Sequence, residues 1–354
     1  MDEDVLSMEI LPRLPLKSLF RFKCVGKSWH RLIADDDHLR RRLPLLTTAV
    51  FYHSDSTSKE PRFACTSSDA GELQESALDF FPFHRNSTII DCCGGLLLSY
   101  ATSTSSFYVL SPITKRWVTL PPARKSTHLA VLAFDPYHSK EFKVISFAGW
   151  LPQGAQLEVF SSETSEWAER SVEWGIGSDA MTATLRYFAG VLYILAFPNY
   201  IVAVDLDGGM QCRRIQLPET VKPEGCIDKS GGFLHYTCNE GSRIRIWVLE
   251  DDDAVGDGGR GKWALKHSVE VGAISRKLPA KLLQQQQQLH LMALHPERDV
   301  VYLRSQEGLV AYDMSKEEAE VACELRKEKQ RAYLVQIWLF PFSRCMSDCL
   351  TDAN

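Results

Sequence analysis

The amino-acid sequence predicts a multidomain chain in which a small helical domain precedes a larger all-β domain. Up to residue 45, apolar residues recur every three or four positions, which is the spacing of an amphipathic helix. Beyond that point, short β-branched and aromatic runs alternate with turn residues, as in a succession of short strands. The 354 residues exceed the roughly 150 residues of one domain. We therefore assign residues 1–45 to the helical domain, 46–342 to the β domain and 343–354 to a C-terminal tail.

The composition excludes several classes of protein. Apolar residues make up 45% of the chain and charged residues 24%, as in globular proteins. The net charge of −5 argues against a chain that coats nucleic acid. No apolar run reaches the roughly 18 residues of a membrane span, and the acidic start Met1-Asp2-Glu3-Asp4 is unlike a secretory signal. We expect a cytoplasmic and/or nuclear protein with reduced cysteines and no nucleic-acid or membrane partner.

Sequence motifs that carry chemistry are also lacking. The chain has no Gly-x-Ser-x-Gly, no His-Glu-x-x-His and no Cys-x-x-Cys, which would mark a nucleophile or a metal site. The glycine-rich run 256–261 is flanked by acidic residues, which repel phosphate. His235 lies between Leu234 and Tyr236 and is interpreted as a core or sheet-face residue. The sequence predicts a chain that is not an enzyme and has no catalytic residue, cofactor or metal.

Three short helices are expected in the helical domain. One covers residues 5–11, a second starts at Pro15, and the apolar face of a third consists of Val25, Trp29, Leu32 and Ile33. Between residues 11 and 42, nine basic and three acidic residues give this stretch a charge of +6. A domain this small is at the lower limit of independent stability. Such a domain often completes its core by docking on a partner.

Residues 4–33, DVLSMEILPRLPLKSLFRFKCVGKSWHRLI, resemble a plant-type F-box. The family usually has Leu-Pro where Met1-Asp2 stand, and often has Cys at the position of Gly26. The resemblance implies binding to the Skp-family adaptor of an SCF-type ubiquitin ligase and, through it, to cullin and RING subunits. The positions that match the family's adaptor contacts are Leu11, Leu14, Pro15, Leu19, Cys24, Val25, Lys27 and Trp29. For Trp29 and Leu32 the alternative is a place in the bundle's own core.

The β domain contains a loose internal repeat. Each unit has a glycine, a strand, a turn, a second strand, a polar turn and often a tryptophan. Trp117 and Trp167 lie 50 residues apart, which is about the length of one four-stranded propeller blade. Five units are clear, and a sixth is expected from residues 47–83, closed by a last strand at 332–340. The sequence therefore predicts a propeller-like domain of about 5–6 blades.

The tryptophans of these units are interpreted as inter-blade packing, because a large apolar ring fits the wedge between adjacent sheets. A ligand-binding aromatic cage is the alternative. The segment resembles the F-box-associated domain of plant F-box proteins in three places: Cys93-Gly94-Gly95-Leu96-Leu97-Leu98, Ser111-Pro112-Ile113-Thr114-Lys115 with Trp117, and Phe134-Asp135-Pro136. The resemblance implies a kelch-like or propeller-like domain that receives a substrate.

Two functions remain after these observations. The first is a substrate-receptor subunit of an SCF-type E3 ubiquitin ligase, whose F-box binds the adaptor and whose β domain recruits a protein for ubiquitination. The second is a β-propeller binding module, for example for glycan recognition, outside a ligase complex. The substrate itself cannot be identified, because propeller loops carry its recognition. The loop residues considered for this contact are Trp150, Trp174 and Tyr200.

Overall fold

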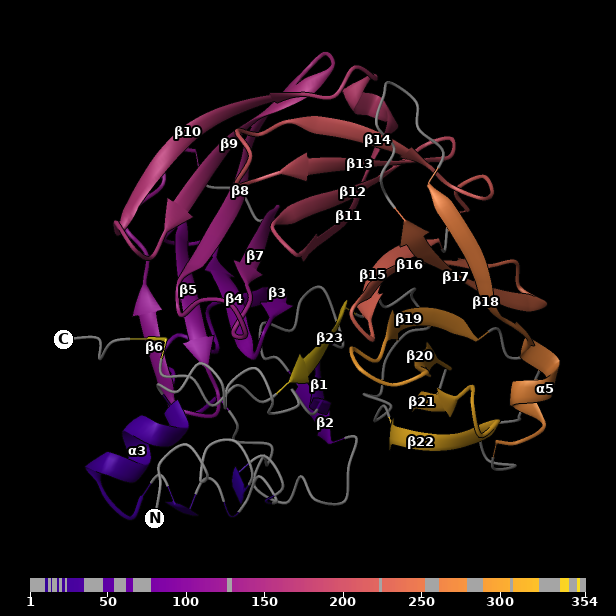
Figure 1. The fold of residues 1–354 in the computed structure, drawn as a ribbon, viewed down its shortest axis with the longest axis horizontal. Coiled ribbons are helices and arrows are strands. Elements are labelled where there is room, and N and C mark those ends of the chain that lie inside the picture. Colours follow the sequence, from indigo (N-terminus) through magenta and orange to yellow (C-terminus); the bar gives the residue numbers. More distant parts are fainter. Residues whose placement is uncertain are drawn as a thin grey trace.

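A computed structural model of the chain describes most of the β domain and part of the helical domain (Figure 1). The described residues are 10–11, 14, 18, 21–22, 24–34, 47–53, 62–65, 78–125, 129–222, 225–251, 261–278, 289–305, 308–324, 338–343 and 349–350.

In the helical domain, the structure describes one helix, α3 (Lys27–Ala34). It is the third of the expected helices and has an apolar stripe at positions 29, 32 and 33. The other two expected helices lie outside the described residues except at isolated positions. A small core joins Leu11 to Ile33, and the side chains packed against it are Leu14, Phe22, Trp29 and Leu32.

The β domain consists of six antiparallel sheets arranged as a ring (Figure 1). Five sheets have four strands each and follow one another along the chain, so that each is one blade. Blade 1 contains β3 (Thr88–Cys93), β4 (Leu96–Ala101), β5 (Ser106–Ser111) and β6 (Arg116–Thr119). Blade 2 contains β7 (Ala130–Phe134), β8 (Phe142–Leu151), β9 (Gly154–Ser161) and β10 (Glu166–Glu173).

The next three blades repeat this order. Blade 3 contains β11 (Met181–Phe188), β12 (Val191–Ala196), β13 (Tyr200–Asp205) and β14 (Cys212–Gln216). Blade 4 contains β15 (Cys226–Ser230), β16 (Phe233–Asn239), β17 (Arg243–Asp251) and β18 (Lys262–Glu270). Blade 5 contains β19 (His290–Leu294), β20 (Val300–Arg304), β21 (Gly308–Asp313) and β22 (Glu318–Glu324). Two short helices lie between blades, η3 (Ser178–Ala180) and α5 (Val271–Ser275).

The sixth sheet takes strands from both ends of the β domain. Its three strands are β2 (Arg62–Cys65), β1 (Thr47–His53) and β23 (Trp338–Ser343), in that order. Strand β1 pairs antiparallel with β23, with position 51 opposite position 340. The predicted closing strand is confirmed, although it lies a few residues later in the chain than 332–340.

The first strand of each blade lies at the centre of the ring. The inner strands contact each other in the closed order β3, β7, β11, β15, β19, β23 and back to β3. Side chains join some of these strands, since the Asp91 carboxylate accepts a hydrogen bond from the Leu132 N–H at 2.7 Å. In the same way, Asp228 accepts one from the Leu294 N–H at 3.1 Å. Each inner strand is therefore flanked by the inner strands of the two neighbouring blades, which protects the inner edges of the sheets.

Tryptophans connect the outer strands of neighbouring blades. Trp117, Trp167 and Trp263 are each the second residue of an outermost strand. The Trp167 indole N–H donates to the Pro121 carbonyl oxygen at 2.8 Å, which belongs to the segment that leaves blade 1. The Trp263 indole N–H donates to the Gln216 carbonyl oxygen of blade 3 at 2.9 Å. The predicted inter-blade role is confirmed for these two residues.

The end of the chain also packs on the ring. Leu350 is 2% exposed and belongs to the apolar core between blades 1 and 2, with Leu96, Leu98 and Phe134. Arg116 donates to its carbonyl oxygen at 3.2 Å. The expected tail therefore contributes to the fold at this point. Among the described residues, no helix is long and apolar enough to cross a membrane.

Candidate interaction surfaces

In the described part of the helical domain, an exposed corner lies where the chain enters α3. Val25 is 68% exposed, and Cys24 and Lys27 are exposed beside it. An apolar side chain with this much exposure in a small domain is suited to a contact with another protein. Three of the expected adaptor-binding residues therefore lie together on the surface.

Other expected adaptor-binding residues occupy the core of the helical domain. Leu11 is only 1% exposed, so its side chain is enclosed by the bundle and does not reach the surface in this conformation. Leu14 and Trp29 are partly buried against that core, and Trp29 stacks on Phe22 with ring centroids 5.1 Å apart. Trp29 therefore takes part in the bundle's own core, which was the alternative to an adaptor contact. Pro15 and Leu19 lie outside the described residues.

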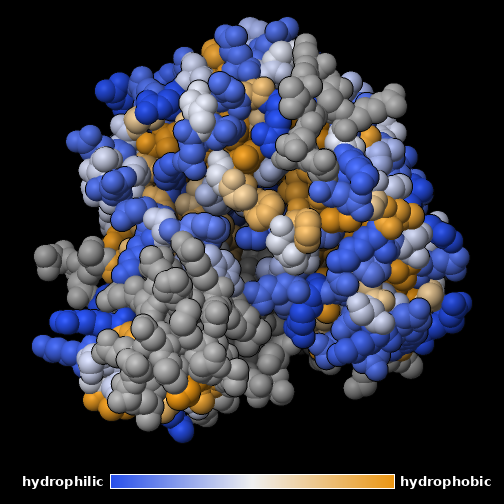
Figure 2. All heavy atoms as spheres, viewed as in Figure 1, coloured by the Kyte–Doolittle hydropathy of each residue, from blue (hydrophilic) through white to orange (hydrophobic). Residues whose placement is uncertain are grey.

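The β domain has two loop faces because successive strands are antiparallel. The β8–β9, β10–β11, β12–β13 and β14–β15 connections emerge on one face, which we call the Trp150 face. The β9–β10, β11–β12 and β15–β16 turns emerge on the opposite face, which we call the Phe233 face. Figure 2 shows that the rim of the ring is mostly hydrophilic, while apolar residues gather toward the middle of the view.

The three loop residues considered for substrate contact all lie at the Trp150 face, but they differ in exposure. Trp150, near the end of β8, is 48% exposed. Trp174 is only 4% exposed and belongs to the core between blades 2 and 3, so the expectation that it lies on a surface loop is wrong. Its ring supports that of Trp150 at 6.0 Å in a T-shaped arrangement. Tyr200 begins β13 and is half-buried against the same core.

Sequence reasoning missed Phe197, which is 44% exposed in the β12–β13 connection of the same face. Its signal in the sequence is an aromatic residue followed by proline between two expected strands. The Phe197 N–H donates to the Ala180 carbonyl oxygen at 2.8 Å, and the Ser178 N–H donates to the Pro152 oxygen at 3.0 Å. Backbone hydrogen bonds therefore join the loops of blades 2 and 3 into one ordered surface.

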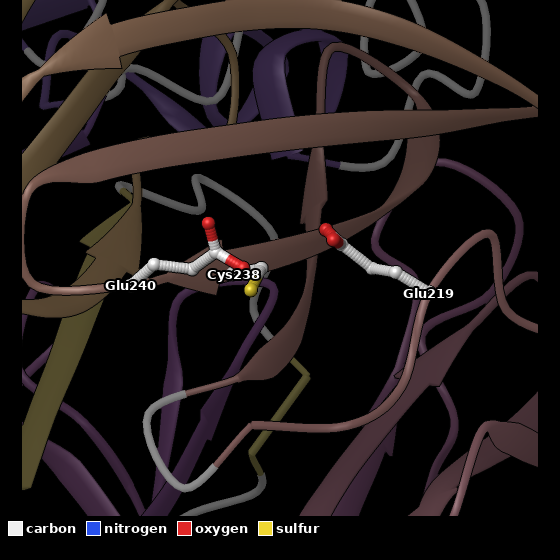
Figure 3. A group of neighbouring side chains, drawn as sticks. All are labelled: Glu219, Cys238 and Glu240. Atoms are coloured by element: carbon white, nitrogen blue, oxygen red, sulfur yellow. The ribbon is translucent and has the colours of Figure 1, made fainter.

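A cluster of possible metal ligands lies at the seam between blades 3 and 4. Glu219, Cys238 and Glu240 place their ligand atoms within 4.8 Å of one another (Figure 3). Arg245 already pairs with both carboxylates, at 2.6 Å from Glu219 and 2.8 Å from Glu240. Burial raises the pKa of the Cys238 thiol to about 11, so the sulfur carries a proton at neutral pH. Lys222 lies 3.9 Å from Glu240, so two cations balance the two carboxylates, and we interpret the cluster as an ion-pair network rather than a metal centre.

Charged groups also lie on the inner strands. Arg186 of β11 pairs with Asp228 of β15 at 3.2 Å, and burial raises the pKa of Asp91 to about 6. His235, on the neighbouring strand β16, is 2% exposed, and burial lowers its pKa, as expected for a core histidine. Because Asp91 and Asp228 each hold a backbone N–H of the next inner strand, these groups serve to join blades.

A pocket of about 420 Å³ opens on the outer rim between blades 1 and 2. Sequence reasoning missed it because its walls come from two blades. The residues that line it belong to the β6–β7 connection (Pro121, Pro122 and Arg124) and the β9–β10 hairpin (Glu158, Ser165, Glu166, Trp167 and Glu169).

Comparison with known proteins places this architecture in a family. Residues 63–348 match the family model described as "F-box protein At3g26010-like, beta-propeller". The chain is 32% identical over 319 residues to "F-box protein At5g07610" of Arabidopsis thaliana, covering 78% of this chain and 72% of that protein. It is 28% identical to "F-box protein At5g49610", covering 78% and 81%, and 27% identical to "Putative F-box/kelch-repeat protein At1g15680", covering 88% and 81%, both also from Arabidopsis thaliana. The chain thus belongs to the At3g26010-like β-propeller family of F-box proteins.

Proposed function

We propose that this chain is a substrate-receptor subunit of an SCF-type ubiquitin ligase and that it has no catalytic residue of its own. The helical domain binds the Skp-family adaptor, and cullin and RING subunits join the complex through that adaptor. The β domain holds the protein to be ubiquitinated. The observation that supports this most is the presence, in one chain, of an F-box-like helical module and the propeller of an F-box protein family.

The exposed corner before α3 is the part of the helical domain suited to the adaptor. Val25 has an apolar side chain that is 68% exposed. Leu11 and Ile33 form the small core that holds α3 in place. Lys27 adds an exposed charge at the start of the helix. This arrangement fits an apolar groove with a polar rim, in the manner of helix-in-groove recognition.

The test is the affinity of the full chain for a purified plant Skp-family adaptor, measured by isothermal titration calorimetry. We expect Val25→Glu to weaken binding by about thirtyfold or more, the effect of losing an interface hot spot. Phe233→Glu is the matched control, because it puts the same charge on an apolar side chain that is 53% exposed on the β domain. Circular dichroism checks that both variants fold. A wild-type chain that fails to bind, or two variants that bind equally, would contradict the proposal.

A further inference from the structure

The core between blades 1 and 2 receives one side chain from outside the sheets. Leu350 is 2% exposed there, although Cys349 and Leu350 belong to none of the described strands. The side chains that form this core come from both blades, among them Leu96 of β4 and Phe134 of β7. We call the place that Leu350 takes in this core the Leu350 socket. It encloses a branched aliphatic side chain almost completely.

The main chain at the Leu350 socket is held as well. Arg116 is the first residue of β6, and its guanidinium donates a hydrogen bond to the Leu350 carbonyl oxygen at 3.2 Å. An apolar pocket for a side chain, combined with a hydrogen bond to the adjoining main chain, is an arrangement by which many protein domains bind peptides. The contact between residues 349–350 and the ring therefore has the form of a bound peptide segment.

The ring does not depend on this segment for its closure. Strand β23 ends at Ser343 and pairs with β1, so the last sheet forms without residues 349–350. In the described part of the chain, no sheet ladder includes Cys349 or Leu350. Segments without ladder hydrogen bonds open locally at a lower free energy than core strands do. The Leu350 socket is therefore a part of the core that can empty while the sheets stay paired.

We propose that the Leu350 socket binds a leucine or similar aliphatic side chain of the protein substrate and that the tail occupies it as an internal competitor, an inference that rests on the function proposed above. The substrate segment carries what the tail carries, an aliphatic side chain and a main-chain carbonyl oxygen that accepts from Arg116. Because the socket encloses one such side chain, the tail and the substrate exclude each other. A tail that fills the socket about nine-tenths of the time lowers the apparent affinity for the substrate about tenfold.

The first experiment supplies the tail from outside. A fluorescein-labelled peptide of residues 345–354, with Cys345→Ser and Cys349→Ser, is titrated with the full chain, and fluorescence anisotropy gives its affinity. We expect the Leu350→Ser chain, whose socket is empty, to bind the peptide at least about tenfold more tightly than the wild type, whose own tail competes. The same peptide with Leu350→Asp is the control and should bind neither chain. Equal affinities of the two chains, or equal binding of the two peptides, would overturn the proposal.

A second measurement needs no variant of the chain. Cys349 is half-buried against the same core as Leu350, so N-ethylmaleimide reaches its thiol mainly when the tail leaves. An excess of the cysteine-free 345–354 peptide should hold the tail out and speed Cys349 labelling at least about threefold, as followed by mass spectrometry. Cys212, half-buried between blades 2 and 3, is the internal control and should react at an unchanged rate. An unchanged Cys349 rate, or an equal rise at Cys212, would contradict the competition.

A third experiment tests the substrate class. Phage-displayed random dodecapeptides are selected on the Leu350→Ser chain, and aliphatic residues at one recurring position should be enriched over a parallel selection on the wild type. Selection without this enrichment would refute the assignment of the substrate side chain. None of these experiments contains the adaptor, and adaptor binding is measured separately on the same preparations. A chain that binds the peptide but not the adaptor would refute the ligase function alone, and the reverse result would refute the socket alone.

Discussion

Trp263 and Gln216 join two blades at the outer rim, where the indole N–H donates to the Gln216 carbonyl oxygen at 2.9 Å. The pair repeats the contact of Trp167 with Pro121 between blades 1 and 2, with one blade interface between the two contacts. In both cases the tryptophan stands second in an outermost strand and reaches the preceding blade, at the last residue of β14 for Trp263 and just after β6 for Trp167. The propeller thus uses one device twice to hold neighbouring sheets together.

Replacing Trp263 by phenylalanine tests how much this contact between blades contributes to the free energy of unfolding. The variant keeps an aromatic ring but leaves the Gln216 carbonyl oxygen without its indole donor. We expect the free energy of unfolding to fall by about 1 to 2 kcal/mol, from the lost hydrogen bond and the smaller ring. Urea denaturation measures it, with Trp150→Phe as the exposed control, which should change stability by less than about 0.5 kcal/mol. An equal loss in both variants would contradict the inter-blade role.

Gly154 should not tolerate a side chain. A Cβ atom at this position would lie 2.0 Å from the Val172 carbonyl oxygen of the neighbouring strand, so backbone has to move. We expect Gly154→Ala to lower the melting temperature and to destabilise the chain by about 2 kcal/mol. Gly272→Ala is the control, because nothing lies within 4 Å of its Cβ position in α5, and alanine there favours the helix. Comparable thermal unfolding of the two variants would show that the close approach is absent.

Asp91 makes stability depend on pH in the acidic range. Burial raises its pKa from 3.8 to about 6, so the folded chain binds the proton more tightly than the unfolded chain does. The stabilisation of the folded chain by protonated Asp91 is therefore fully present below about pH 4 and is lost as the pH rises through 6. We expect Asp91→Asn, compared with the wild type by urea unfolding at pH 4, 5, 6 and 7, to remove this decrease. A difference between the two proteins that does not change with pH would rule out this titration.

The pH dependence of stability expected from His295 has the opposite sign to that expected from Asp91. This histidine is 2% exposed, and its Nδ1 accepts the N–H groups of Glu297 and Arg298, each at 3.0 Å. Burial lowers its pKa from 6.5 to about 3, so protonation favours the unfolded chain. Its contribution is present above about pH 6.5 and is lost as the pH falls toward 3. His295→Asn should be less stable at pH 7 and should lose less stability on acidification, as followed by tryptophan fluorescence. Parallel acid-unfolding curves for the variant and the wild type would argue against it.

The sequence predicts the architecture of the β domain well because the repeat is local. Gly94, the strands after it and Trp117 recur at the length of one blade, and each unit can be recognised without its neighbours. The closing strand could also be predicted from the sequence, because a ring without it would have a free edge. The position of Trp167 between blades could be predicted because a large apolar ring fits the wedge between adjacent sheets.

The interaction surfaces were harder to predict because they depend on how distant segments meet. Trp174 looks like a loop residue in the sequence, yet the chain turns back after β10 and buries it under Trp150. Leu11 matches a family contact position but packs on Ile33 of α3. The opposition of Glu158 and Glu169 exists only in the register of the β9–β10 hairpin. None of these contacts can be predicted from the spacing of residues along the chain.

The pairing of β1 with β23 imposes an order on biosynthesis. The helical domain leaves the ribosome first, whereas the ring waits for residues 338–343 before its last sheet can form. A nascent chain therefore carries an F-box-like segment ahead of a receptor that is still open. A transcript that ends early would yield a protein with β3 and β19 left as bare inner edges, a form prone to aggregate and to be removed by chaperones and proteases.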